Sequence, residues 1–186
     1  TTEETSATGR CSAAVAHERD IRMKAPKIAI VVGSKSDLPY LGVRMPVLRR
    51  SWRSLLPAHP LHDGAELAEA LGELWDRAEF REERYTALAL VDRYPQWVTL
   101  PLLERLVVEG AWWDYVDMLA RQVGRLLRRE PSTAAAMRRW SREANPWKRR
   151  VSIICQLGLK QDTDLALLYD CIEPNLDDRE FFVRKA

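Results

Sequence analysis

The sequence predicts an all-α fold in which short helices pair and stack as repeats. Apolar residues after position 45 recur at the three- and four-residue spacing of helices that are buried on one side. Pro and Gly interrupt this pattern at intervals, which predicts a turn after each helix. One aromatic residue per unit recurs at Phe80, Trp113, Trp147 and Phe181, with spacings of 33, 34 and 34 residues. A period near 34 with two helices per unit is typical of helical solenoids, whose units bury their apolar faces on their neighbours.

Nine helices are expected, and turn residues mark where they begin and end. The first begins at Met45-Pro46 and ends at Pro57, because proline suits the first turn of a helix better than its interior. The second carries Leu67 and Leu71 at helical spacing. The expected ranges are 45–57, 64–77, 79–94, 100–109, 112–129, 133–143, 147–157, 165–172 and 179–186.

Residues 1–34 predict a loose or atypical N-terminal segment that precedes a repeat domain at 35–186. Residues 1–27 lack a periodic apolar face and the apolar region of a secretory signal. The β-branched run at 27–32 predicts a short strand that leads into a turn. This stretch resembles the opening of PurE-type ribonucleotide carboxylases and mutases, whose phosphate-binding loop GSxSD matches Gly33, Ser34, Ser36 and Asp37. The resemblance covers about a dozen residues, so a purine-biosynthetic carboxylase or mutase fragment is kept as a lower alternative.

The charge of the chain is unevenly distributed along its length. Residues 121–150 hold ten Lys or Arg and two acids, a net charge of +8, whereas residues 61–90 hold three Arg and eight acids, a net charge of −5. The later half is therefore expected to meet a polyanion. The alternative, that these arginines are ordinary solvated residues on helix surfaces, stays open.

Cysteine, histidine and hydropathy patterns narrow the class of protein. The three cysteines, Cys11, Cys155 and Cys171, are widely spaced and form no CxxC motif, so neither a disulfide framework nor a zinc site is indicated and a cytoplasmic location is expected. The histidines lie far from the tryptophans, which disfavours a His-based centre. No apolar run approaches the ~18 residues of a membrane span. We expect a monomer without metal, cofactor or membrane partner.

The sequence GAWWDYVDMLARQV at 110–123 contains the strongest candidate site. Trp113 and Asp117 are four residues apart, so a helix places them one turn apart on the same face. An aromatic plane beside a carboxylate suits a flat, cationic ligand. Alternatively, Trp112 and Trp113 belong to the core and the carboxylate is merely solvated. Asp114 competes for the role of the carboxylate and is interpreted as a first-turn acid favoured by the helix dipole.

The repeat register predicts which residues lie near Asp117. Counting three or four residues past each recurrent aromatic places Asp117, Arg150 and Arg184 at equivalent positions of stacked units, on the surface made by the second helices. Phe80 and Phe181 are expected in the core between repeats.

Six motifs over about 35–186 resemble the bacterial DNA alkylation repair glycosylases of the AlkD type. In chain order they are DLPYLGV at 37–43, EFREERY at 79–85, GAWWDYVD at 110–117, NPWKRR at 145–150, QLGLK at 156–160 and EFFVRKA at 180–186. That family consists of HEAT-like helical-repeat proteins that remove alkylated purines from duplex DNA. The resemblance implies that Asp117 is the catalytic carboxylate, that Trp113 flanks the lesion and that Arg150 contacts the DNA backbone.

The expected activity is that of a DNA glycosylase, a hydrolase that excises cationic N3- or N7-alkylated purines from duplex DNA. Lys148, Arg149, Arg184 and Lys185 are further candidate phosphate contacts. Family members continue into a helix that supplies another tryptophan, so the domain is expected to be truncated at its C-terminus and its activity impaired. A non-catalytic helical scaffold that binds DNA or protein is the main alternative, and it would not need Asp117.

Overall fold

The computed structural model describes residues 38–186, and these residues form helices and turns without a strand. Several helices begin with a proline or with a side-chain cap. Thr99 caps the helix that begins at Leu100 by accepting from the N–H of Leu102, and Asp164 caps the helix that begins at Leu165 by accepting from the N–H of Leu167. The α-helices are α2 (Met45–Ala58), α3 (Gly64–Leu71), α4 (Arg81–Arg93), α5 (Leu100–Gly110), α6 (Trp113–Arg129), α7 (Thr133–Trp140), α8 (Pro146–Ile154), α9 (Leu165–Ile172) and α10 (Phe181–Arg184).

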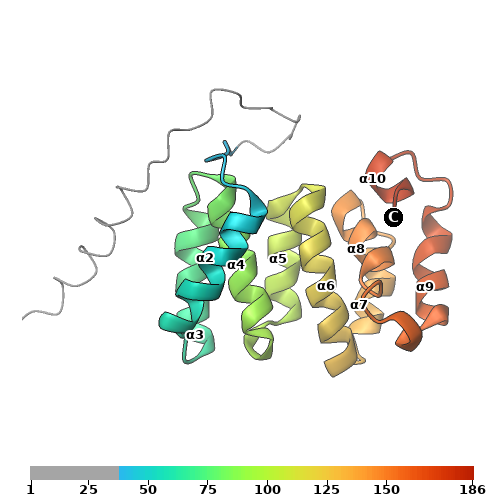
Figure 1. Cartoon of the computed structure of the whole chain (residues 1–186). Helices are drawn as coiled ribbons and strands as arrows, with labels where there is room; N and C mark the ends of the chain where they lie inside the picture. Colours follow the sequence, from blue (N-terminus) through green and yellow to red (C-terminus); the bar gives the residue numbers. More distant parts are fainter. Residues whose placement is uncertain (1–37) are drawn as a thin grey trace, which may run out of the picture. The chain divides into compact units, whose positions relative to one another are not determined.

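The helices stack in chain order as antiparallel pairs, which confirms the predicted all-α repeat fold (Figure 1). One layer contains α2, α4, α6, α8 and α10, each packed on the next. In the second layer α3 packs on α4, α5 on α6 and α7 on α8. A π-helical turn, Gly72–Asp76, extends α3 and buries Trp75. Each helix therefore contacts its partner and the neighbouring repeats, and the core runs along the stack.

Side-chain hydrogen bonds between successive repeats follow the period of the sequence. Trp75 Nε1 donates to Glu109 Oε2 at 2.8 Å, and Asn175 Nδ2 donates to the carbonyl of Ser141 at 2.9 Å; both pairs are 34 residues apart. Trp52 Nε1 donates to Thr86 Oγ1 over the same interval, at 3.1 Å. Equivalent positions of successive repeats therefore lie against one another.

Several expected helix boundaries differ from the observed ones. The expected range 179–186 is reduced to α10, Phe181–Arg184. Expected helix 133–143 ends at Trp140, where Ser141 caps it and the chain turns toward Asn145. The predicted strand at 27–32, the GSxSD turn and the domain boundary near residue 34 lie outside the described residues. Residues 38–186 contribute none of the alternating strands that the carboxylase alternative requires.

The backbones of α6 and the end of α8 approach closely at Gly124. A Cβ atom on Gly124 would lie 2.1 Å from the carbonyl oxygen of Cys155, so only a glycine allows the two backbones to approach this far. The cysteines Cys155 and Cys171 are buried free thiols, and Cys11 lies outside the described residues. None of the helices in the described range combines the length and apolarity of a bilayer span.

Candidate functional site

The two tryptophans at the start of α6 face different environments. Trp112 is half-buried, and its ring packs against Trp147 and Phe182, with centroid distances of 6.3 and 5.4 Å. Trp113, the first residue of α6, is 45% exposed. The core interpretation therefore holds for Trp112, whereas Trp113 presents its indole at the surface.

Asp117 lies one turn further along α6 and is held by Arg150 of α8. The guanidinium binds the carboxylate in a bidentate pair, with Nε–Oδ1 at 2.7 Å and Nη2–Oδ2 at 2.8 Å. Nη1 donates to the carbonyl of Phe182 at 2.6 Å, so each guanidinium nitrogen is engaged. The Arg150 side chain is 9% exposed and the Asp117 side chain 36%. The repeat register predicted that these two residues are neighbours; the structure adds that Asp117 is accessible while Arg150 is buried.

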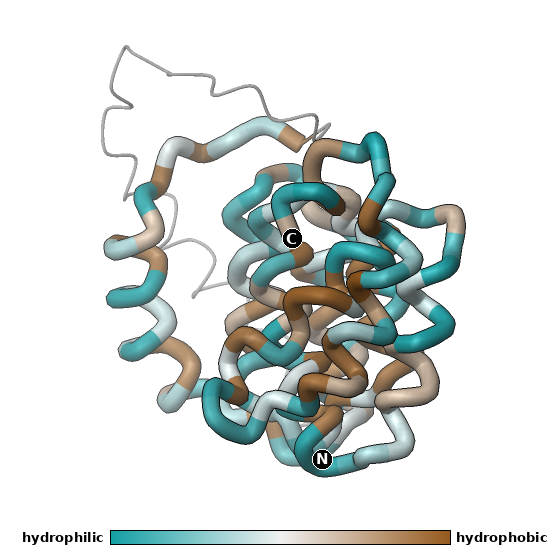
Figure 2. Tube along the Cα trace, turned by 90° about the vertical axis from the view of Figure 1, so that its right-hand side faces the viewer, coloured by the Kyte–Doolittle hydropathy of each residue, from teal (hydrophilic) through white to brown (hydrophobic). Residues whose placement is uncertain are grey.

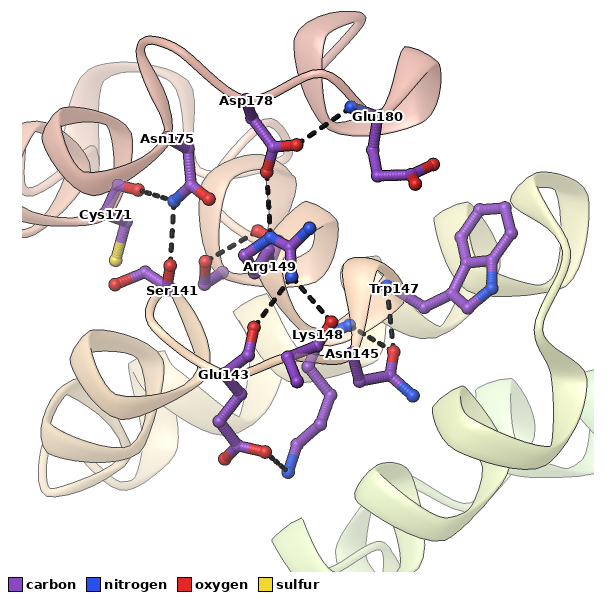
Figure 3. Close-up of polar contacts among 12 residues, drawn as sticks. Ser141, Glu143, Asn145, Trp147, Lys148, Arg149, Cys171, Asn175, Asp178 and Glu180 are labelled. Carbon is purple, nitrogen blue, oxygen red and sulfur yellow. Dashed lines mark hydrogen bonds and ion pairs between the residues drawn. The ribbon is translucent and has the colours of Figure 1, made fainter.

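The start of α8, the helix that carries Arg150, is fixed by a helix cap and by the contacts of Arg149. Asn145 caps the helix by accepting from the backbone N–H groups of Trp147 and Lys148, and Pro146 occupies the first turn. Arg149 donates to Asp178 and to the carbonyls of Glu143 and Ala144, and Figure 3 shows the contacts with Asp178 and Glu143. The turn before α8 and the chain before α10 are therefore held to the same helix.

Lys148, a predicted phosphate contact, is bound to carboxylates within the protein. Its ammonium bonds to Glu104 and Glu143 and lies 5.3 Å from the centroid of Trp140 (Figure 3 shows the Glu143 contact). Burial alone would lower the pKa of Lys148, but the two carboxylates outweigh it and raise the pKa. Its side chain is 8% exposed, so Lys148 is not presented to a phosphate, and the prediction of a DNA contact is corrected to a buried tie between α5 and α8.

Asp114 forms a second ion pair, with α4 instead of α8. It accepts from Arg81 Nη2 at 2.6 and 2.8 Å and from the Tyr85 hydroxyl at 2.5 Å. Burial and the hydrogen bond to Asp114 raise the pKa of Tyr85. Arg81 is fully buried, and its guanidinium lies 4.4 Å from the centroid of Tyr115. Asp114 is the acid of the first turn of α6, as predicted, and it also anchors α6 to α4 through its pair with Arg81.

Comparison with known proteins identifies the family. The family described as DNA alkylation repair enzyme matches residues 20–186. The chain belongs to this family. Among solved structures, a predicted DNA alkylation repair enzyme from Enterococcus faecalis shares the fold, with a TM-score of 0.71 and 21% identity over 100% of this chain and 81% of that one. No match was found among curated proteins.

Membership of the DNA alkylation repair enzyme family supports a role in the repair of alkylated DNA. Of the predicted site residues, Asp117 and Arg150 form an ion pair, and Trp113 lies one helical turn before Asp117 on α6. The described residues contain no cluster of three or more His, Cys, Asp or Glu placed to hold a metal ion.

The C-terminal residues of the predicted site lie on α10 and after it. Arg184 and Lys185 are exposed, and Lys185 Nζ lies 5.8 Å from the centroid of Phe181. No hydrogen bond or ion pair joins Arg184 to Asp117 or Arg150 in the described structure. Phe181 is 64% exposed, so its predicted place in the core is wrong; Phe182 packs against Trp112 and Trp147 instead. The sequence signal for this was the FF pair, in which either ring fits the repeat period to within one residue.

Proposed function

We propose that this chain is a DNA glycosylase of the AlkD type that excises cationic N3- or N7-alkylated purines from duplex DNA. Asp117 is the catalytic carboxylate and Trp113 the aromatic surface beside the lesion. The observation that carries the proposal is an accessible carboxylate held by a buried guanidinium, one helical turn from an exposed indole. Membership of a DNA alkylation repair enzyme family supports it.

The chemistry needs no more than one fixed carboxylate. A purine alkylated on N3 or N7 is already positively charged, so the glycosidic bond can break with its electron pair moving to the base, without a general acid. The sugar left behind resembles an oxocarbenium ion, and a water molecule adds to C1′. Asp117 can stabilise that positive charge, orient the water and accept its proton.

The strength of this effect depends on Arg150. Two unit charges about 4 Å apart attract by about 4 kcal/mol at an effective dielectric constant of about 20, which corresponds to roughly a thousandfold in rate. The guanidinium offsets part of that field, so about 4 kcal/mol is an upper figure. In return, the bidentate pair with Arg150 fixes the position of the carboxylate.

This geometry changes the expected role of Arg150. The sequence predicts a contact with the DNA backbone, but the three guanidinium nitrogens already donate to Asp117 and Phe182. We therefore propose that Arg150 positions Asp117. Arg149 is held by Asp178 in the same way, so Arg184 and Lys185 remain the better candidates for phosphate contacts.

The test is release of bases from duplex DNA treated with a methylating agent. Asp117→Asn should reduce release at least a hundredfold while duplex binding is kept. Asp162→Asn is the matched control, since Asp162 is an exposed acid that pairs with Arg128 away from this site; it should release bases at the wild-type rate.

Three outcomes are informative. Loss of release in Asp117→Asn alone, at a temperature where both variants are folded and duplex binding is kept, supports the glycosylase. Duplex binding without release by the unmodified chain would refute it and favour the non-catalytic scaffold. Equal losses in both variants would show that Asp117 has no special role.

A further inference from the structure

A groove separates α2 from α4 and α6, outside the Asp117 site. Its volume is about 630 Å³, and Trp113, Asp117 and Arg150 do not line it. Figure 2 shows α2 standing apart from the other helices along one side of the stack. No residue of α2 is buried, so the helix is a wall of the groove rather than part of the core.

The floor of the groove is apolar and includes an aromatic ring. Trp52 of α2, Leu88 of α4 and Met118 of α6 contribute to it. The hydrogen bond from Trp52 Nε1 to Thr86 Oγ1, at 3.1 Å, ties the indole to α4 and orients its ring. A fixed indole beside flexible thioether and aliphatic groups is suited to the flat face of a nucleobase.

The rim is cationic and comes from all three helices. Arg49 and Arg53 lie one turn apart on α2, Arg93 ends α4, and Arg121 lies on α6. Asp92 is the one carboxylate among the lining residues, and it is already bound by Gln122 Nε2 at 2.7 Å and Arg125 Nη1 at 2.9 Å. The groove therefore has a surplus of guanidinium groups, which favours phosphate.

We propose that this groove binds single-stranded DNA, with unpaired bases on its apolar floor and phosphates on its arginine rim. Stacking platforms within a basic groove are the means by which proteins hold single strands without reading their sequence. A volume of about 630 Å³ lies in the range of small-ligand sites, so it accommodates one or two nucleotides. A duplex keeps the faces of its bases stacked and would leave the floor unused.

The groove lies next to the proposed glycosylase site along α6. Arg121 follows Asp117 by four residues on α6, so the two lie one turn apart on the same face. A strand that enters the groove would thus run toward Asp117. The inference concerns binding to undamaged DNA, so its failure is independent of whether bases are released.

The test measures the affinity of the whole chain for a short fluorescent oligo-dT and for a hairpin duplex of equal charge. Arg49→Ala/Arg53→Ala should weaken oligo-dT binding at least tenfold and lower the salt slope by about 1.4, since each lost phosphate contact on a single strand removes about 0.7. Arg44→Ala/Arg50→Ala removes the same charge from exposed positions that do not line the groove, and should change the affinity less than threefold.

A second variant tests the opposite wall without touching α2. Arg121→Ala should weaken oligo-dT binding about threefold or more, whereas Arg139→Ala, an exposed arginine of α7, should not. Equal effects of the two double variants would show that oligo-dT binds by general charge attraction and not in the groove, which would overturn the proposal. Duplex binding lost in the same proportion as oligo-dT binding would also overturn it.

Discussion

Two aspartates one turn apart on α6 bind arginines of opposite neighbours. Asp114 pairs with Arg81 of α4, and Asp117 pairs with Arg150 of α8. In both pairs the partners are 33 residues apart. Both arginines are buried, and the carboxylates differ: the Asp114 side chain is 18% exposed and the Asp117 side chain 36%. One pair can therefore serve packing and the other chemistry.

Removal of the Asp114 charge should be costly. Asp114→Asn leaves the buried Arg81 guanidinium without its charged partner, and breaking such a pair costs about 3–5 kcal/mol. Asp162→Asn, which breaks an exposed pair with Arg128, should cost about 1 kcal/mol or less. Urea unfolding at pH 7 measures both. Equal losses for the two variants would contradict the assignment of Asp114 as an anchor.

Gly124 should tolerate no side chain. In Gly124→Ala the new Cβ would lie 2.1 Å from the Cys155 carbonyl, so α6 and α8 must move apart. We expect a destabilisation of about 1–3 kcal/mol or more, although alanine is the better helix former by about 1 kcal/mol. Gly72→Ala is the control, because a Cβ there meets nothing within 4 Å. Comparison of urea midpoints decides; similar midpoints would show that the helices separate freely.

At the scale of elements, the junction of α6 and α8 should be sensitive to alkaline pH. Burial raises the pKa of the Cys155 thiol to about 12, whereas an unfolded thiol titrates near 8.5. Between these values the folded state keeps a proton that the unfolded chain releases. The free energy of unfolding should therefore be unaffected below about pH 8.5 and then fall, by up to about 1.4 kcal/mol per pH unit.

Cys155→Ala isolates this contribution from those of other groups. The variant should lose less stability than the unmodified chain between pH 8.5 and 10.5, as measured by urea unfolding at each pH. Parallel pH profiles for the two proteins would show that the thiol does not titrate differently in the folded state.

The elements themselves were largely predictable from the sequence. Apolar periodicity and proline placed α9 at its observed limits, 165–172, and placed the start of α8 at 147, within one residue of its observed start at Pro146. The length of α10 was not predictable in this way, because the charged residues that surround Phe181–Arg184 are compatible with either helix or turn. Helix ends depend on tertiary contacts that periodicity does not contain.

At the scale of the whole molecule, the repeat period explains which parts of the site could be predicted. It placed Asp117 beside Arg150, and the same interval would have joined Arg81 to Asp114. It could not predict the contact of Lys148 with Glu104, which spans 44 residues and crosses between layers. Contacts between residues that are not one repeat apart depend on the length and direction of the side chains, which the repeat period does not contain.

Pairing between elements also revises the meaning of the basic run at 121–150. Seven of its ten cationic side chains form ion pairs with acids, six of them with acids of other elements or turns. Many of these cationic side chains therefore join neighbouring helices, and the run does not form a continuous surface for binding a polyanion. Arg121, which makes no ion pair in the described structure, leaves its charge available in the groove beside α2.

The stack should open from α2, because that helix is held by the fewest buried groups. Its entry depends on Glu82 of α4, whose carboxylate accepts the N–H groups of Leu41, Gly42 and Val43 at 2.9, 2.9 and 3.0 Å. Hydrogen exchange followed by mass spectrometry should therefore show faster exchange in α2 than in α6. Glu82→Gln weakens the anchor and should speed exchange in α2 at least threefold while α6 is unchanged.

Glu83→Gln is the matched control for this prediction. Glu83 accepts from the backbone of Glu79 and Phe80 at the start of α4, so its loss should speed exchange there and leave α2 as it was. If Glu82→Gln speeds exchange equally in α2 and α6, the repeats unfold as one cooperative unit. If α2 exchanges as slowly as α6 in the unmodified chain, the helix is part of the rigid core, and a groove that depends on an outlying α2 would need another wall.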